Sequence, residues 1–283
     1  MALTETPQPD WTRRAERAVP KLDVPSLRSI KNAPAVDERR LRALLILRPF
    51  VGLATFAAMA FTGWWLAAPV VLWLLYGSTA TALHHLIHGS LGLSPAARHR
   101  WLTVLGLLIL ESGHAWQTTH VMHHRDGSDL PDPEGYIEYL TWRQLPVGAF
   151  QWRFRIAAWG WRHTTQRRRT TAELAINATA TVAAVALVPV TTVPLIYVAM
   201  MQLGTFLFAV LLAKGPQTNF GRATTTPLMM VHTRLLGIFL FNHHLHLEHH
   251  AYPKVPMARL RQLRPTVEAA LTDEHVVHVH LAA

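Results

Sequence analysis

The sequence predicts an all-α integral membrane protein with four transmembrane helices in two hairpins and a cytosolic helical cap that holds clustered histidines. Three observations support this fold class. Half of the 283 residues are hydrophobic and only 16% are charged, whereas about 25% of an ordinary soluble domain is charged. Two nearly uncharged stretches are each long enough for a pair of spans. The 18 histidines outnumber the 17 acidic residues, and most lie in three short segments.

Each predicted hairpin is an apolar stretch of about 40 residues, twice the length of about 20 that a helical span needs. The first covers residues 44–83, with Gly63 near its middle. The second covers residues 173–213, in which Pro189 and Pro194 flank a predicted turn. The two stretches therefore predict four spans.

Two further apolar segments do not meet the requirements of a span. Leu102–Leu110 is too short. Leu228–Phe241 is interrupted by His232 and Arg234. We expect both segments to form interfacial or buried helices.

Two hairpins place the N-terminal segment, the loop 84–171 and the region from Lys214 onward on one side of the membrane. The turns on the other side, around Gly63 and Val190, carry no Lys or Arg. The shared side carries the arginines, among them Arg13, Arg14, Arg39, Arg40, Arg98, Arg100, Arg153, Arg155 and Arg167 to Arg169. The positive-inside rule therefore predicts that both termini and the histidine clusters face the cytoplasm.

The chain reads as one membrane domain with a tail at each end. Residues 1–42 are polar and Arg-rich, without the apolar core of a secretory signal, and are expected to form a cytosolic tail. Residues 43–265 form the predicted membrane domain. Residues 266–283 form a C-terminal tail, in which His275, His278 and His280 alternate with apolar residues as in a short strand or a tail. These histidines are expected to be structural or disordered and not to bind metal.

Composition excludes several kinds of site. The chain has no cysteine, so disulfides, thiolate zinc sites and iron–sulfur clusters are excluded. Any metal must be bound by nitrogen and oxygen. The net charge of +10 would suggest nucleic acid in a soluble protein, but a membrane surface explains it here, and no nucleic-acid partner is expected.

Three histidine clusters each lie beside a predicted membrane boundary. The first is His84, His85 and His88, the second is His120, His123 and His124, and the third is His246, His249 and His250, preceded by Asn242, His243 and His244. Histidines three or four residues apart on a helix share a face and converge on one metal, while the adjacent histidine points about 100° away. This spacing predicts two metal ions held between the clusters. Neutral imidazole suits iron, copper, zinc and nickel, so the ligands alone do not identify the metal.

Other metal-binding patterns do not match. No HExxH zinc-protease motif is present. Soluble di-iron bundles use two Glu-x-x-His motifs, and only Glu111 and His114 have that spacing here. A haem cytochrome with two histidine ligands would place single histidines inside its spans, and the interiors of 44–83 and 173–213 contain none.

With its motifs HHLIH, HVMHH and HLEHHAYPKVP in this order around two hairpins, the sequence resembles the membrane fatty acid desaturase family. This histidine-box superfamily also includes acyl hydroxylases and carotenoid ketolases. The resemblance covers roughly residues 44–265, and Pro253, Val255 and Pro256 after the third motif are especially similar to bacterial acyl desaturases.

The resemblance implies a histidine-box di-iron site in the helical cap. The implied ligands are His84, His88, His120, His123, His124, His246, His249 and His250. In parts of the family a further residue before the third motif completes the set, and Asn219, His232, Asn242, His243 and His244 are candidates here. His244 is the preferred one. His85 and His114 are expected to be hydrogen-bonded groups around the ligands.

The implied activity is that of an O2-dependent di-iron membrane oxidoreductase that desaturates a fatty acyl chain of a lipid. A hydroxylase or carotenoid ketolase with the same site is the alternative, and a zinc-binding membrane sensor or hydrolase is the alternative from another class. The chain has no haem-attachment motif and no dinucleotide-binding fingerprint. A separate electron donor, such as ferredoxin and its reductase, is therefore expected.

Some charged residues are candidates for supporting roles. Asp126 or Asp132, in the loop that also contains Asp129 and Glu134, could orient a ligand imidazole, and Glu248 inside the third motif is the stronger candidate. The arginines 167–169 are expected to face lipid headgroups or to dock an acidic electron donor.

Overall fold

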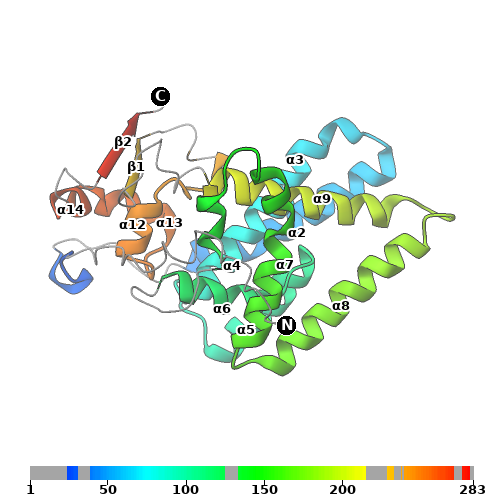
Figure 1. Ribbon diagram of the computed structural model, residues 1–283, viewed down its shortest axis with the longest axis horizontal. Coiled ribbons are helices and arrows are strands. Elements are labelled where there is room, and N and C mark those ends of the chain that lie inside the picture. Colours follow the sequence, from blue (N-terminus) through cyan, green and yellow to red (C-terminus); the bar gives the residue numbers. More distant parts are fainter. Residues whose placement is uncertain are drawn as a thin grey trace, which may run out of the picture.

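The computed structural model describes residues 24–30, 39–124, 133–214, 228–232, 237, 239–270 and 276–280. Helices dominate the described part of the chain (Figure 1). Three helical segments within it are long and apolar enough to cross a membrane, namely Arg39–Thr62, Trp65–His88 and Val193–Leu211. Three of the four predicted spans thus have helices of the expected kind.

The first hairpin has the predicted form. Its first arm is α2 (Arg39–Thr62), and the turn follows at Gly63, whose positive φ of 69° suits glycine. The second arm runs through η2 (Trp65–Ala67), α3 (Ala68–Leu72), the π-helical η3 (Trp73–Gly77) and α4 (Ser78–His88). The two arms approach closely at Gly52, because a Cβ there would lie 2.6 Å from the Leu75 backbone. This hairpin delivers the first histidine cluster at its end.

The next helices cover the end of α4. The helix α5 (Pro95–Leu108) begins at Ser94, whose Oγ accepts a hydrogen bond from the Ala97 amide. After a tight turn, α6 (Gly113–His123) begins in the same way at Ser112. A Cβ at Gly113 would overlap the Leu102 carbonyl, so glycine permits the close contact of α5 with α6. The predicted helix at Leu102–Leu110 is the second half of α5, and its Leu102 and Leu105 are buried.

The second hairpin follows η4 (Gly135–Tyr139) and α7 (Leu145–His163). It consists of α8 (Arg167–Ala186), α9 (Val193–Phe208) and the π-helical η5 (Ala209–Lys214). In Figure 1, α8 and α9 diverge from their shared turn. The helix α8 is long enough to span but is not among the segments that are sufficiently apolar, because arginine, threonine and asparagine interrupt its alanines. The fourth span stays a prediction.

The C-terminal region forms a smaller unit beside the first two clusters (Figure 1). Its helices are α12 (His246–Ala251), α13 (Met257–Leu260), η6 (Arg261–Leu263) and α14 (Arg264–Ala269). Their buried residues form a separate apolar core that η1 (Leu27–Ser29) also contacts. The Tyr252 hydroxyl donates a hydrogen bond of 2.8 Å to the Pro25 carbonyl, which ties the two segments together.

The prediction of a helix over Leu228–Phe241 was wrong at its beginning. Residues Leu228–His232 form the strand β1, which pairs in parallel with β2 (Val276–His280). The pairing joins segments far apart in sequence, and this long-range partner overrides the local apolar pattern. Of the two possibilities left open for His278 and His280, a short strand or a tail, the structure shows a strand, β2, whereas His275 lies outside the described residues. The boundaries proposed at residues 42 and 265 stay predictions.

A large apolar core holds α4, α6 and α7 together. Trp116 on α6 and Trp152 on α7 are 1% and 0% exposed and contact each other edge to face. Phe208 of α9 packs against both rings. Because interiors are close-packed, this core limits the movement of the α4 and α6 ends, where the first two histidine clusters lie.

Candidate metal centre

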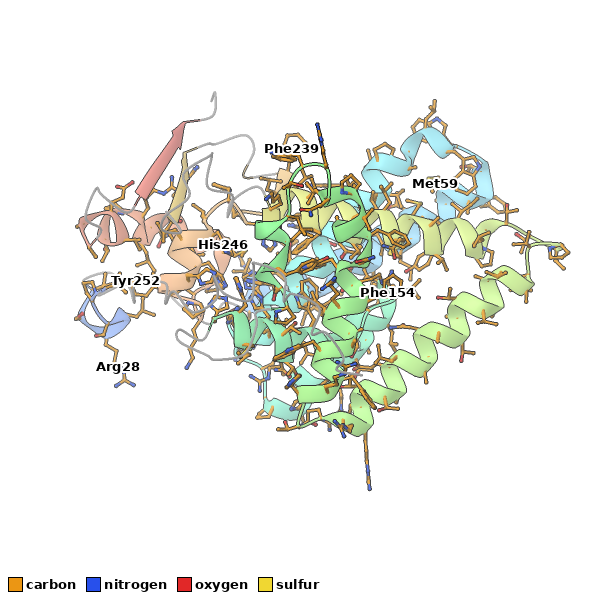
Figure 2. The ribbon with its side chains drawn as sticks, in the orientation of Figure 1. Arg28, Met59, Phe154, Phe239, His246 and Tyr252 are labelled. Carbon is orange, nitrogen blue, oxygen red and sulfur yellow. The ribbon has the colours of Figure 1, made fainter. Side chains whose placement is uncertain are left out.

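The three histidine clusters meet where α12 faces the ends of α4 and α6 (Figure 1). Figure 2 shows His246 on α12, on the side of the C-terminal unit that faces the central helices. Rings from all three helices are neighbours: the His84 ring centroid lies 4.7 Å from that of His120 and 4.3 Å from that of His249. Segments of the chain, some of them more than 100 residues apart, thus bring their histidine rings into one region.

All eight histidines that the three motifs predicted as ligands fall into two groups. The larger group is His84, His88, His120, His124 and His249, and the smaller group is His123, His246 and His250. Within each group, one ring nitrogen from every member lies within 4.8 Å of the others. The smaller group is only half-buried, so it is the more accessible of the two.

Each HxxHH motif is divided between the two groups. On α6, the one-turn pair His120 and His124 belongs to the larger group and His123 belongs to the smaller one. On α12 the assignment is reversed, because His246 and His250 form the pair in the smaller group and His249 crosses to the larger one. Helical periodicity permits both arrangements, since residues four apart lie about 40° apart around the axis and the intervening histidine lies about 100° from its sequence neighbour.

Several ring nitrogens in the larger group lie so close together that the available N–H protons cannot form a hydrogen bond for every contact. His124 Nε2 lies 3.2 Å from His120 Nε2 and 3.1 Å from His249 Nε2. His120 Nδ1 lies 2.9 Å from a carboxylate oxygen of Glu134, to which it donates its proton, so a neutral His120 presents a lone pair at Nε2. A single proton on His124 can serve only one of its two neighbours. A shared cation satisfies all three nitrogens.

Buried ring nitrogens without hydrogen-bond partners among the described residues also indicate that a cation is needed at this site. His84 Nδ1, His88 Nε2 and His249 Nδ1 are buried and have no hydrogen-bond partner among the described residues. Burial, followed by the charges of neighbouring histidines, holds the pKa of His249 and His250 well below 6.5. Both imidazoles are therefore neutral at pH 7, which is the form that binds metal. Nitrogen donors in this number and state fit two transition-metal ions.

Glu134 is the carboxylate that orients a histidine of the larger group. Its two oxygens lie 3.0 and 2.9 Å from His120 Nδ1. Trp116 Nε1 donates to the same carboxylate at 3.4 Å, and Trp152 Nε1 donates to the Glu134 carbonyl at 3.2 Å. The sequence argument favoured Asp126 or Asp132 instead, and both lie outside the described residues. Loop sequence offers no periodicity, so nothing local distinguished Glu134 from its acidic neighbours.

Two histidines expected around the ligands make their hydrogen bonds elsewhere. His85 Nδ1 lies 2.8 Å from Ser90 Oγ, within the turn that ends α4. His114 Nδ1 lies 2.6 Å from Glu173 Oε1, and its Nε2 lies 2.9 Å from His99 Nδ1. None of these hydrogen bonds reaches one of the eight clustered histidines. His85 nevertheless packs its ring 6.2 Å from that of His84.

The candidates for a further ligand are placed unequally. His243 is the nearest, with its ring 5.4 Å from that of His84 and Nε2 3.2 Å from Thr81 Oγ1. His244, the preferred candidate, belongs to neither group, although both of its ring nitrogens lack a hydrogen-bond partner among the described residues. Asn242 has a positive φ of 65°, which turns the chain into the third motif. Asn219 lies outside the described residues, and His232 is in β1.

Glu248 stabilises the third motif through an ion pair with Arg264 of α14. It is fully buried, and its Oε1 accepts a hydrogen bond of 2.5 Å from Arg264 Nε at the start of α14. Burial raises the pKa of the Glu248 carboxyl, and the positive charge of Arg264 opposes this shift. The ion pair joins α12 to α14 and thereby positions the helix that carries three of the clustered histidines.

Comparison with known proteins identifies a family over most of the chain. The family model described as Fatty acid desaturase matches residues 62–282. The match includes all three histidine motifs and both predicted hairpins, except the first arm of the first hairpin. No curated protein matches the chain significantly.

Proposed function

Because the chain belongs to the fatty acid desaturase family, whose members are oxidoreductases that act on acyl chains, we propose that it is an O2-dependent di-iron membrane enzyme that desaturates a fatty acyl chain of a lipid. The observation that carries this proposal is the division of eight histidines into two groups of converging nitrogens. One group of five and one of three match the ligand shells of two ions.

From these groups we propose which histidines bind each ion. His84, His88, His120, His124 and His249 would hold one ion, and His123, His246 and His250 would hold the other. When bound, two irons supply the redox chemistry that removes two hydrogens from an unactivated methylene, with O2 and two external electrons as co-reactants. The protein determines where the acyl chain meets that chemistry.

Residues of the chain perform three tasks at the site. The Glu134 carboxylate accepts a hydrogen bond from His120 Nδ1–H, which fixes the tautomer that presents Nε2 to the ion. Buried packing by Trp116 and Trp152 keeps water from this pair, so the hydrogen bond is not exchanged with solvent. The Arg264–Glu248 ion pair holds α12 against α14. These contacts favour a rigid site rather than one assembled on binding.

The remaining parts of the proposal concern sidedness and partners. We propose that the metal centre and both termini face the cytoplasm, because the arginines lie on the side of the histidine clusters. We propose a four-span arrangement with α8 as the additional span, in which the substrate's acyl chain lies in the same membrane. A separate donor, such as ferredoxin with its reductase, would supply electrons, since a chain without cysteine cannot hold an iron–sulfur cluster.

Mass spectrometry of lipids and pigments tests the proposal in cells that express the wild-type chain or the His249→Ala variant, each with a compatible electron donor. A loss of two hydrogens from acyl chains in the wild type alone supports desaturation. A gain of oxygen would instead identify a hydroxylase or ketolase. Zinc rather than iron in the purified protein, with no O2 consumption, would replace the oxidoreductase by a zinc-binding sensor or hydrolase.

A further inference from the structure

The helix α5 lies beside the start of α8, away from α12 (Figure 1). Basic side chains line the space between these two helices. A hollow of about 460 Å³ opens there. His99, Arg100 and Arg169 line one end of it, whereas Val104 and Ile176 line the other. Neither the proposed reaction nor the metal centre uses these residues.

The basic end of the hollow has positive charge without a carboxylate partner among the described residues. Arg100 and Arg169 are both exposed. Arg169 donates a hydrogen bond of 3.1 Å to Gln166 Oε1, which is a neutral acceptor. Burial lowers the pKa of His99, and the positive charges of Arg169 and Arg98 contribute to that shift. The potential at this end therefore favours an anion.

The acidic residue of the hollow, Glu173, is buried and makes its hydrogen bonds within the protein interior. Glu173 is 1% exposed, and its carboxylate accepts hydrogen bonds of 2.6 Å from Thr103 Oγ1 and from Ser112 Oγ. His114 Nδ1 adds a third at 2.6 Å. Glu173 keeps its negative charge, but its hydrogen bonds go to these three donors and not to the two arginines, which outnumber it in the hollow. Its side chain lines the buried part of the hollow.

Along both α5 and α8, the side chains that line the hollow change from basic to apolar in the same direction. Arg169, Ala172, Glu173 and Ile176 follow the spacing of one face of α8. The bond between Thr103 and Glu173 sets the register, which places basic residues on one side of it and the apolar Val104 and Ile176 on the other. A basic end followed by an apolar end matches an amphiphile that has an anionic head.

The position of the hollow favours a lipid as the source of that amphiphile. It lies along the first turns of α8, beside the arginine run that marks one side of the predicted membrane. Val104 and Ile176 are 44% and 50% exposed, as is usual for side chains that contact lipid tails. We propose that the hollow binds one anionic phospholipid, with its phosphate between Arg100 and Arg169 and an acyl chain along Val104 and Ile176.

Binding to the purified full-length protein tests the proposal, and it requires no turnover. Native mass spectrometry in detergent would compare phosphatidylglycerol with phosphatidylcholine at equal concentration. We expect preferential retention of one phosphatidylglycerol. Arg169→Gln should raise its Kd at least about tenfold, because a charge-assisted hydrogen bond contributes about 1.5–3 kcal/mol. The matched control Arg168→Gln, which removes the same charge one residue away, should change the Kd by less than about twofold.

The apolar end has its own variant. Ile176→Asn should weaken phosphatidylglycerol binding, because it places an amide against the acyl chain. It should leave any binding of inorganic phosphate unchanged. Equal weakening by Arg168→Gln and Arg169→Gln would overturn the proposal in favour of general attraction to the arginine run. Equal retention of the two lipids, or inorganic phosphate that binds as tightly as the lipid, would also overturn it.

Discussion

Two histidines of α6 each pair with a buried carboxylate, but the second ring nitrogens of the two histidines have different neighbours. Glu134 is 2.9 Å from His120 Nδ1, and Glu173 is 2.6 Å from His114 Nδ1. All four side chains are buried. The two histidines lie six residues apart on one helix, which places them about 120° apart around its axis, so they face different neighbours.

The second ring nitrogen separates the two pairs. His120 Nε2 joins a group of five histidines whose nitrogens cannot all be satisfied by protons. His114 Nε2 faces only His99 Nδ1, at 2.9 Å, so one proton between them completes the arrangement. A carboxylate that orients a histidine therefore does not by itself indicate a metal site. The number of converging nitrogens does.

The largest expected effect comes from removing one ligand of either group. His249→Ala or His123→Ala should reduce activity below detection and lower the iron content of the purified protein, while membrane insertion is retained. The reason is that each variant removes one nitrogen donor from its histidine group, and no neighbouring side chain among the described residues replaces that donor. Turnover and iron analysis measure this, with His114→Ala as the control that should retain iron. Full turnover in both ligand variants would contradict the assignment.

A smaller effect is expected when the orienting carboxylate is changed. Glu134→Gln should weaken metal affinity by about 10–100-fold, because it removes the negative charge that strengthens His120 as a ligand. The matched variant Glu173→Gln changes the same kind of pair outside the metal centre and should alter affinity by less than about twofold. Competition with a chelator measures both. Similar losses in the two variants would show that the pairs have the same role.

The network around Glu173 should instead affect stability. Glu173→Ala leaves Ser112, Thr103 and His114 without their acceptor in a buried site. The expected loss is about 1–3 kcal/mol in the free energy of unfolding. Chemical denaturation in detergent measures it, and iron content per folded chain should not change. A stability equal to that of the wild type would mean that the network is dispensable.

Near neutral pH His244 provides the smallest effect, and it defines the edge of the metal centre. Burial, together with Arg264 and Arg261, lowers its pKa from 6.5 to about 4. The unfolded chain then binds more protons below pH 6.5, so stability present above that pH is lost as the pH falls toward 4. The slope that His244 contributes is at most about 1.4 kcal/mol per pH unit.

Replacement of His244 by glutamine should therefore reduce the acid sensitivity of unfolding while iron content stays the same. Denaturation curves at several pH values between 4 and 7 measure the difference from the wild type. Loss of one iron from His244→Gln would instead support the sequence-based prediction that this residue is a ligand.

Local patterns predicted those parts of the fold that depend on short stretches of chain. The apolar lengths predicted the first hairpin and the turn between α8 and α9, and both are present. The apolar pattern of Leu228–Phe241 failed because β1 pairs with β2, a segment more than 40 residues away. Strand pairing depends on a partner that local composition does not show.

What the sequence by itself determined is that each histidine motif places two rings on one helical face and that adjacent rings point about 100° apart. Spacings of three and four residues on a helix decide which rings share a face, and this is a property of the backbone alone. Which rings gather in each of the two groups was decided by the structure. What only the tertiary structure decided is which groups lie next to those rings: Glu134 at His120, His243 nearer than His244, and Glu173 at His114. These partners come from separate elements, so only packing between distant segments selects them.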